Sequence, residues 1–320
     1  MSTLKPGFSP SSPVLLWAVF GALFSCFSIT VFGAWLFSAE AFVAVPISVA
    51  DTMPGHTLLL LRGLEGLSMV VAVMGLYACL IKPWLRTGQV PLAGLLLVGA
   101  LITYVLDTTV NFSDYHMAWN KHSFNRGTWA SFFPGHTGPT QYAEAWLWGP
   151  PMYMYFGVVL AAIQLKVFDW SRPRLGLLAG LLLTFATAFT FDFIAESVII
   201  RYSHAYAWPY TVGAWSVWAG TQFQFPLYES LLVAVYASLY SVLLHSERGQ
   251  KVAWIEQGSE AFSRPWKGLI CLFAATGFAA LCTTIYFGGF YLFSQFADSQ
   301  VAMPAYLQFV DPVWSGTPVR

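Results

Sequence analysis

Acidic side chains stand within apolar stretches of this sequence, where a charged group is costly and usually functional. Asp192 and Glu196 lie four residues apart in FDFIAE, and Glu229 follows in QFPLYE. Residues four apart share one face of a helix, so Asp192 and Glu196 are expected to point in the same direction. Carboxyl groups that meet in a medium of low dielectric constant cannot all ionise, so at least one holds a proton at neutral pH. A protonated carboxyl beside an ionised one forms an acid–base pair.

Other carboxyl groups are candidates by position. Asp107, near the end of another apolar stretch, is a further catalytic candidate. Glu65 and Arg62 can pair on one helix face and are candidates for substrate binding. Asp114 and Glu144 are expected at the rim of the membrane, where capping or solvation explains a carboxylate equally well. A structural alternative stays open for every one of these groups, since a buried carboxyl can also form hydrogen bonds across helices or pair with an arginine.

The composition excludes a water-soluble protein. Of the 320 residues, 57% are hydrophobic and only 9% are charged, against roughly 25% charged residues in a soluble domain. The 15 Lys and Arg balance the 15 Asp and Glu, so the formal net charge is zero. These values exclude a soluble enzyme, a nucleic-acid-binding protein with a basic face, and a disordered chain. They indicate a polytopic membrane protein surrounded by lipid.

Seven segments are long and apolar enough to cross a bilayer as helices, which takes about 20 residues each. They cover about residues 14–37, 56–81, 91–110, 144–165, 175–198, 222–244 and 268–294. Only helices and closed barrels satisfy the backbone in lipid, and these segments are too long and too evenly apolar for barrel strands. The sequence therefore predicts an all-α fold with one seven-helix membrane domain at 14–294, an N-terminal tail at 1–13 and a C-terminal tail at 295–320.

The distribution of Lys and Arg predicts the orientation. One side of the membrane carries ten of them, Lys5, Lys82, Arg86, Lys166, Arg172, Arg174, Arg248, Lys251, Arg264 and Lys267. The other side carries four, Lys121, Arg126, Arg201 and Arg320. We therefore expect a multi-pass protein of the bacterial inner membrane with a cytoplasmic N-terminus and an external C-terminus. The long connection at about 111–143 then lies outside, and its Trp, Tyr, Phe and His content indicates a folded cap.

The sequence carries no signature of a cofactor-dependent site. The spacings of the histidines match no HExxH pattern, and no metal or other cofactor is expected. The last apolar segment has no Lys for a retinal Schiff base, and Walker A, GxGxxG and GxSxG motifs are absent. Pro226 is expected to kink or open the start of the sixth helix near Glu229, which would lie about two turns inside it.

Several strings of the sequence resemble the AveC-type spirocyclase family of bacterial integral membrane proteins. They are DTTVN at 107–111, NRGTW at 125–129, PGH at 134–136, FDFIAE at 191–196 and QFPLYE at 224–229. The resemblance covers about residues 56–294, and its most specific part is the pair of FDFxxE and QFPLYE. By motif match, the polar positions of the family fall on Asp107, Asn111, Arg126, Trp129, Asp192, Glu196, Gln224, Tyr228 and Glu229.

The resemblance implies a reaction that suits the carboxyl groups. The family is named for the spirocyclase/dehydratase of avermectin-type macrolide biosynthesis, which implies spiroketal formation from a lipophilic dihydroxy-ketone, in some members with dehydration. Such a reaction needs an acid, a base, negative charge near an oxocarbenium ion and a dry, shaped pocket. We expect Glu196 to be the protonated acid, Asp192 its partner base or cation stabiliser and Glu229 the second acid. Asp107 and Asn111 would orient the substrate.

Two other classes of function use similar groups. A membrane terpene- or meroterpenoid-type cyclase or isomerase also protonates its substrate with intramembrane carboxyl groups and stabilises a cation with aromatic rings. A proton-coupled transporter or lipid-binding protein uses carboxylate relays. The sequence shows no internal repeat and no matched pair of broken helices, which speaks against a transporter. The oligomeric state is not predicted.

Overall fold

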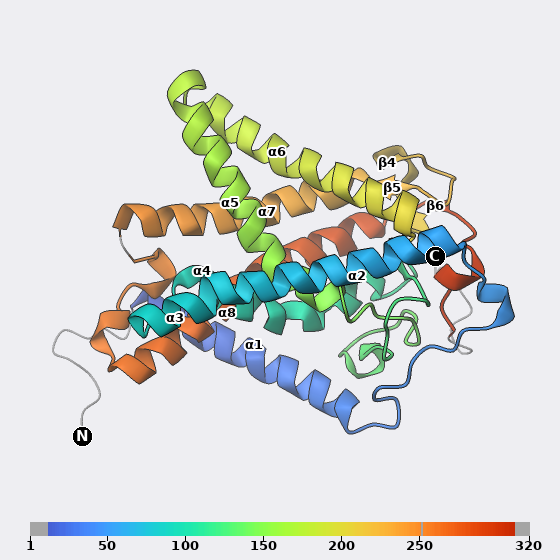
Figure 1. Ribbon diagram of the computed structural model, residues 1–320, viewed down its shortest axis with the longest axis horizontal. Helices are drawn as coiled ribbons and strands as arrows, with labels where there is room; N and C mark the ends of the chain where they lie inside the picture. Colours follow the sequence, from blue (N-terminus) through green and yellow to red (C-terminus); the bar gives the residue numbers. More distant parts are fainter. Residues whose placement is uncertain (1–11, 251, 311–320) are drawn as a thin grey trace.

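Long helices form the body of the molecule, and a cap of loops and short strands covers one end of it (Figure 1). The structure, a computed structural model, describes residues 12–250 and 252–310. Within them lie seven membrane-spanning segments, Pro13–Leu36, Gly55–Thr87, Leu92–Asn111, Gly149–Leu175, Leu177–Ser203, Leu227–Arg248 and Arg264–Ser294. The prediction of an all-α membrane protein with seven spans is confirmed. Lys5, Lys251, Arg320 and the distal parts of both expected tails lie outside the described residues.

Several spans change their winding before they end. A π-helical turn separates α2 from α3 within the second span, the third span finishes as the 3₁₀ helix η3, and α6 finishes as the π-helical turn η5. Such irregular segments often mark functional sites. The helices are α1 (Pro13–Leu36), α2 (Gly55–Leu76), η2 (Tyr77–Ile81), α3 (Lys82–Thr87), α4 (Leu92–Ile102), η3 (Thr103–Asn111), α5 (Gly149–Leu175), α6 (Leu177–Val198), η5 (Ile199–Ser203), α7 (Leu227–Gln250) and α8 (Arg264–Ser294).

Helix α8 is the centre of the bundle, because it contacts α1, α4, α7 and η3. Small residues allow this close packing. A Cβ atom on Gly21 of α1 would collide with the carbonyl oxygen of Phe273, and one on Gly277 of α8 would collide with that of Trp17. Glycine at such crossings lets two helix backbones approach in a membrane, where van der Waals contact replaces hydrophobic burial.

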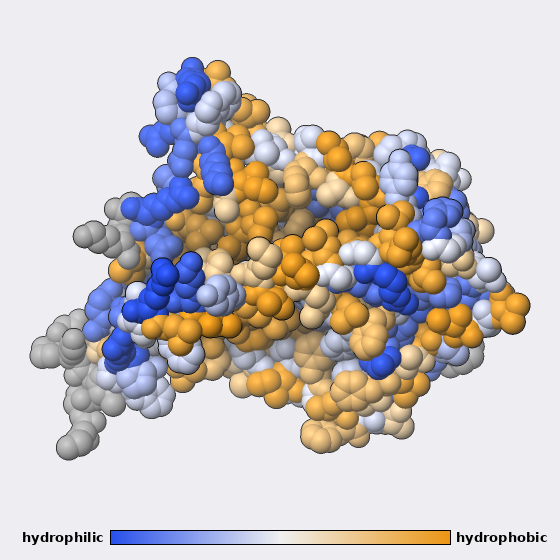
Figure 2. Space-filling model, in the orientation of Figure 1, coloured by the Kyte–Doolittle hydropathy of each residue, from blue (hydrophilic) through white to orange (hydrophobic). Residues whose placement is uncertain are grey.

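Helices α5 and α6 form a hairpin that leaves the bundle and returns to it (Figure 1). The two helices are joined at Gly176, whose φ of +83° suits glycine. Figure 2 shows hydrophilic residues at the tip of this hairpin and at the same end of the molecule as α3. The basic residues of these segments include Lys82, Arg86, Lys166, Arg172 and Arg174. These basic residues lie at the end of the molecule away from the cap, in agreement with the charge distribution used to predict the orientation. The orientation itself stays a prediction.

We define the cap as residues 112–148, 204–226 and 299–310. Three antiparallel strand pairs hold these segments together: β1 (Ala118–Trp119) with β2 (Tyr206–Ala207), β3 (Tyr210–Thr211) with β6 (Ser299–Gln300), and β4 (Ser216–Val217) with β5 (Phe225–Pro226). A buried ion pair links the cap to the connection before α2, since Lys121 Nζ lies 2.8 Å from Asp51 Oδ1. The prediction of a structured connection between the third and fourth spans is confirmed, and residues 299–310 of the expected C-terminal tail take part in the cap.

Two helices begin later than the sequence predicts. The fourth span starts at Gly149 rather than 144, with prolines in its first turn, and the sixth starts at Leu227 rather than 222. Proline favours the first turn of a helix, because an N–H group is not needed there. Pro226 pairs within β5 and precedes α7, so it does not kink that helix. Glu229 therefore lies in the first turn of α7 and not two turns inside it.

Candidate active site

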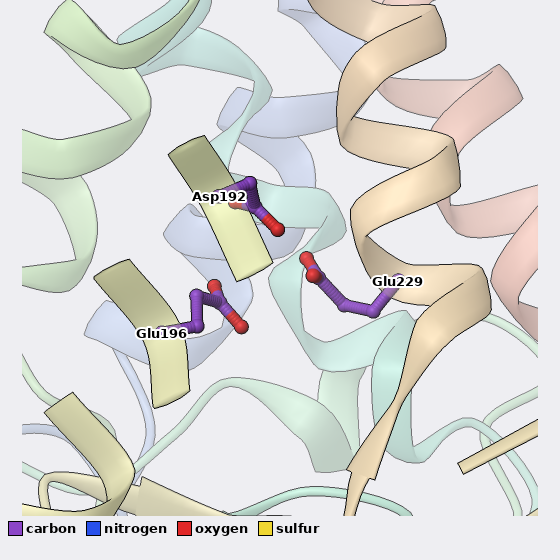
Figure 3. A group of neighbouring side chains, drawn as sticks. All are labelled: Asp192, Glu196 and Glu229. Atoms are coloured by element: carbon purple, nitrogen blue, oxygen red, sulfur yellow. The ribbon is translucent and has the colours of Figure 1, made fainter. Parts of the chain in front are cut away.

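Three carboxyl groups meet where α6 passes α7. Asp192 and Glu196 extend from α6 toward Glu229 on the first turn of α7 (Figure 3). One oxygen from each of the three lies within 4.8 Å of the other two. The spacing of four residues explains the shared direction of Asp192 and Glu196. The late start of α7 brings Glu229 to the same level, where the positive end of the helix dipole favours a negative charge.

The hydrogen bonds of this triad leave room for shared protons. Ser230 Oγ donates to Asp192 Oδ2 at 2.8 Å, and the Tyr286 hydroxyl donates to Glu229 Oε1 at 2.8 Å. The other oxygen of each of these two carboxyl groups, and Glu196 Oε2, have no donor among the described residues. Three ionised carboxylates at this distance would repel one another strongly in a low dielectric, so the triad is expected to hold protons of its own.

The triad borders a cavity with two chambers. The membrane chamber is lined by Met152, Tyr153, Phe156, Glu196, Glu229, Val233, Tyr236, Thr283 and Tyr286. The cap chamber is lined by Asp107, Val110, Met117, Trp119, Trp148, Met152, Tyr153, Glu196, Tyr206, Trp208, Glu229, Tyr286 and Phe287. Glu196 and Glu229 line both chambers and so stand where the two meet. Asp192 lines neither and lies behind the glutamates.

A second acid pair consists of Asp107, which lines the cap chamber, and Glu144, which is buried outside the lining of both chambers. The Tyr153 hydroxyl donates to Asp107 Oδ1 at 2.7 Å, and the Tyr104 hydroxyl donates to Glu144 Oε1 at 2.6 Å. Burial and the adjacent Asp107 raise the pKa of Glu144 well above its usual range. A protonated Glu144 can therefore donate a hydrogen bond to Asp107. This bond would join Glu144 Oε2 and Asp107 Oδ2, the two oxygens of the pair that otherwise have no partner.

The expectation that Glu144 sits at a solvated rim is wrong. This side chain is fully buried, because the segment before α5 turns inward instead of extending the helix. The chemistry of the pair resembles that of the triad: two carboxyl groups, one shared proton and tyrosine hydroxyls as donors. The cap chamber therefore has proton-holding groups on two of its walls.

Three of the candidate binding residues hold the cap to the helices. Arg62 bonds with Glu65 at 2.5 Å and also donates to the carbonyl oxygen of His122, and Glu65 accepts the backbone N–H of Phe124. Asn111 accepts the backbone N–H groups of His116 and Met117, both at 2.9 Å. None of the three lines either chamber.

The other candidate binding residues also lie outside the cavity lining. Arg126 stacks over the ring of Phe124, and Trp129 donates its indole N–H to the carbonyl oxygen of Val105. Gln224 donates to the carbonyl oxygen of Trp208, which lines the cap chamber. Tyr228 packs face to face with Phe293. Any role of these four in binding would be indirect, through the shape of the cap.

Several residues of the cavity have no signal in the sequence that singles them out. Tyr153 and Tyr286 each donate to a carboxyl group, and Trp119, Trp148 and Trp208 line the cap chamber. Tyrosine and tryptophan are abundant in this chain and common at membrane interfaces, so composition does not separate these five from the rest.

Oxygen ligands for a metal ion are present. Among residues 12–250 and 252–310, Asp192, Glu196 and Glu229 form a group whose oxygens lie close enough to bind one cation together. Carboxylate oxygens suit hard cations such as Mg²⁺, Mn²⁺ or Ca²⁺. Tyr286 and Ser230 each donate to one oxygen of Glu229 and Asp192, so a proton or a metal ion would compete for the remaining oxygens.

The fold and the site define a multi-pass membrane protein with a buried, acid-lined cavity for a small molecule. The sequence model of the AveC-like spirocyclase family matches residues 88–310, more than half of the chain. The chain therefore belongs to the AveC-like spirocyclase family, and with it to the enzymes that form spiroketals. The match includes both acid centres and the whole cap. No curated protein and no solved structure matches the chain.

Proposed function

We propose that this protein converts a lipophilic dihydroxy-ketone into a spiroketal by acid–base catalysis without a cofactor. The observation that carries the proposal is the position of Glu196 and Glu229 at the junction of the two chambers. Each of these two carboxyl groups has an oxygen that lacks a hydrogen-bond donor. A spiroketal has two rings that share one carbon, and two chambers on either side of an acid centre suit such a product.

The proposed reaction takes place in three steps and releases one water. One hydroxyl adds to the ketone carbon while the carbonyl oxygen takes a proton from Glu196 and the hydroxyl proton passes to Glu229. A carboxylic acid then protonates the resulting hydroxyl, which leaves as water and gives an oxocarbenium ion. The second hydroxyl attacks this cation, and its proton goes to a carboxylate. General acid–base catalysis of this kind contributes about 10²- to 10⁴-fold to a rate.

Asp192 acts in this scheme as a positioning residue, since it lines neither chamber. Its contact with Ser230 and its place beside the glutamates fit a negative charge that keeps a proton on one of them and stabilises the cation. Asp107 lines the cap chamber and is proposed to orient the second hydroxyl, whose proton passes to the Glu196 carboxylate and restores the starting protonation state.

The substrate is proposed to reach the site from the bilayer. Figure 2 shows a mainly apolar hollow between the α5–α6 hairpin and α2, on a face without a covering element. The membrane chamber has apolar lining residues from α5, α7 and α8 and is not fully enclosed. A lipophilic substrate made in the cytoplasm can partition into the membrane, which reconciles cytoplasmic synthesis with the proposed external cap in the bacterial inner membrane.

Comparison of metabolites from strains with and without the gene tests this function. Untargeted mass spectrometry should show an accumulated precursor in the deletion strain that is heavier by one water than the lost product, or by two waters where dehydration follows. A precursor and product of identical composition would instead indicate a terpene-type cyclase or isomerase. One compound that only moves between cells and medium would indicate transport, and both of these results contradict the proposal.

A further inference from the structure

Three buried indole N–H groups beside the cap chamber have no acceptor. Trp119, Trp148 and Trp208 each have an exposed fraction of 2% and line this chamber. Their Nε1 atoms are without a hydrogen-bond partner among the described residues. An unsatisfied buried donor typically costs about 1–3 kcal/mol, and native proteins tolerate few of them without a functional reason. Three such donors beside one cavity therefore require an explanation.

Other tryptophans of the chain show that the fold can satisfy such groups. Trp129 donates its indole N–H to the carbonyl oxygen of Val105 at 2.9 Å, and Trp146 donates to that of Gly127 at 3.2 Å. Both belong to the same aromatic region, since Trp129 and Trp146 lie 5.7 Å apart. Trp35 of α1, which stacks on Trp146, is the other buried tryptophan of the described residues without an acceptor, so three of the four such groups gather at the cap chamber.

The three side chains form a continuous aromatic wall together with Tyr206. Ring centroids lie 4.9 Å apart for Trp119 and Trp148, 5.5 Å for Trp148 and Tyr206, and 6.0 Å for Tyr206 and Trp208. The pairing of β1 with β2 places Trp119 opposite Tyr206. Segments far apart in the chain are thus brought together by the cap to build this wall, which we call the indole wall.

The donors and the charges of the chamber restrict the ligand. An indole is a hydrogen-bond donor only, so its partner is an acceptor oxygen such as an ether, hydroxyl or carbonyl. No Lys or Arg lines the chamber, whereas Asp107, Glu196 and Glu229 do. An anionic ligand would therefore be repelled, and a hydrocarbon would leave the three N–H groups unsatisfied.

We propose that the indole wall binds the oxygen atoms of an uncharged, oxygen-rich substrate and product, and so selects this class of ligand against hydrocarbons of the same shape. The inference rests on the proposed spiroketal chemistry for the nature of the ligand. It goes beyond that proposal because it assigns substrate recognition to Trp119, Trp148 and Trp208, which lie outside the sequence strings that carry the resemblance to the family.

The test is the binding of two matched probes to the full-length protein in detergent. The first is a synthetic spiroketal with one oxygen in each of its five- and six-membered rings, and the second is the spiro hydrocarbon of the same shape. Protein labelled with ¹⁵N in the indole groups reports each N–H in an NMR spectrum, and single Trp→Phe variants assign the signals. We expect the signals of Trp119, Trp148 and Trp208 to shift with the spiroketal and to stay unchanged with the hydrocarbon.

Affinity provides the second readout. Each of W119F, W148F and W208F should weaken spiroketal binding about 2- to 10-fold, the value of one neutral hydrogen bond. W146F is the matched control, because it removes an N–H whose acceptor is the backbone carbonyl of Gly127, outside both chambers, and it should leave the affinity unchanged. If one variant fails to fold, the spectra of the wild-type protein with the spiroketal and with the hydrocarbon still test the inference.

Equal binding of the two probes, no binding of either, or shifts that spare the three indole signals would overturn the inference. None of these readouts requires turnover. A protein that binds the spiroketal as expected but shows no loss of water in the metabolite comparison would refute the proposed function and leave the indole wall as a binding site.

Discussion

Glu196 and Glu229 belong to different helices, and both line the membrane chamber and the cap chamber. A ligand that extends through both chambers must pass these two carboxyl groups. Asp192 lies outside the lining of both chambers, with an oxygen within 4.8 Å of an oxygen of each glutamate. It also accepts a hydrogen bond from Ser230. This arrangement separates the groups that can touch a substrate from the one that adjusts their charge.

Loss of the tyrosine hydroxyl that contacts Glu229 should slow the reaction without unfolding the protein. Tyr286→Phe removes the 2.8 Å hydrogen bond and keeps the ring in place. A hydrogen bond to an ionised group contributes about 1.5–3 kcal/mol, so we expect turnover to fall at least about 10-fold. Tyr236→Phe is a suitable control, because this neighbour lines the membrane chamber but donates to Tyr240 instead of a carboxyl group. Equal losses in both variants would contradict the specific role of Tyr286.

Glu144 is expected to be protonated at neutral pH, because burial and Asp107 raise its pKa. Glu144→Gln preserves an acceptor for Tyr104 and a donor for Asp107, so the melting temperature should stay close to that of the wild type. Glu144→Ala leaves the Tyr104 hydroxyl without its acceptor and should cost about 1–3 kcal/mol in unfolding free energy. Thermal unfolding in detergent distinguishes the two, and a Gln variant as unstable as the Ala variant would mean that Glu144 is ionised.

The cap should lose stability as the pH falls, through His116. Burial lowers the pKa of this side chain from 6.5 to about 4, while its ring stacks on Tyr210. The unfolded chain binds a proton below about pH 6.5 and the folded chain only below about pH 4. The stabilisation is therefore full above pH 6.5 and declines by roughly 3 kcal/mol toward pH 4. His116→Phe, which keeps an aromatic ring but does not titrate, should show a smaller drop in melting temperature between pH 7 and pH 5.

Removal of divalent cations distinguishes an acid–base triad from a metal site. The three carboxyl groups are close enough to bind a cation, whereas the proposed mechanism needs protons in the same place. We expect turnover by the purified protein to be unchanged after treatment with EDTA and unchanged by added Mg²⁺, Mn²⁺ or Ca²⁺. Activity that is lost with EDTA and restored by one of these ions would replace the proposed mechanism with a metal-dependent one.

The helical part of the site could be predicted from the sequence, whereas the cap could not. Asp192 and Glu196 share a face because of helix geometry alone, and apolar length was sufficient to find the seven spans. Glu229 was found as a candidate, but its depth was wrong because the start of α7 depends on the pairing of Pro226 in β5. Helix ends that are set by tertiary contacts leave only a weak local signal.

The remaining residues of the site depend on contacts between distant segments. Glu144 was expected at the rim, and its burial follows from the path of the loop before α5. Trp119 enters the chamber because β1 pairs with β2, almost a hundred positions later, and no periodic pattern encodes this pairing. The family motifs also include Asn111 and Gln224, which form hydrogen bonds with the cap backbone. The motifs alone therefore do not distinguish residues that line the cavity from residues that only hold the cap backbone in place.

The most direct test of the central claim is the return of single variants to a strain that lacks the gene, with mass spectrometry of precursor and product. Glu196→Gln and Glu229→Gln should each reduce the formation of the water-loss product by about 10²- to 10⁴-fold, because each removes an acid or base from the junction of the chambers. The matched control Glu65→Gln changes a buried carboxyl that lies outside the cavity, and it should retain product if the cap stays folded. Normal product formation by both Glu196→Gln and Glu229→Gln, at wild-type protein levels, would contradict acid–base catalysis by this pair.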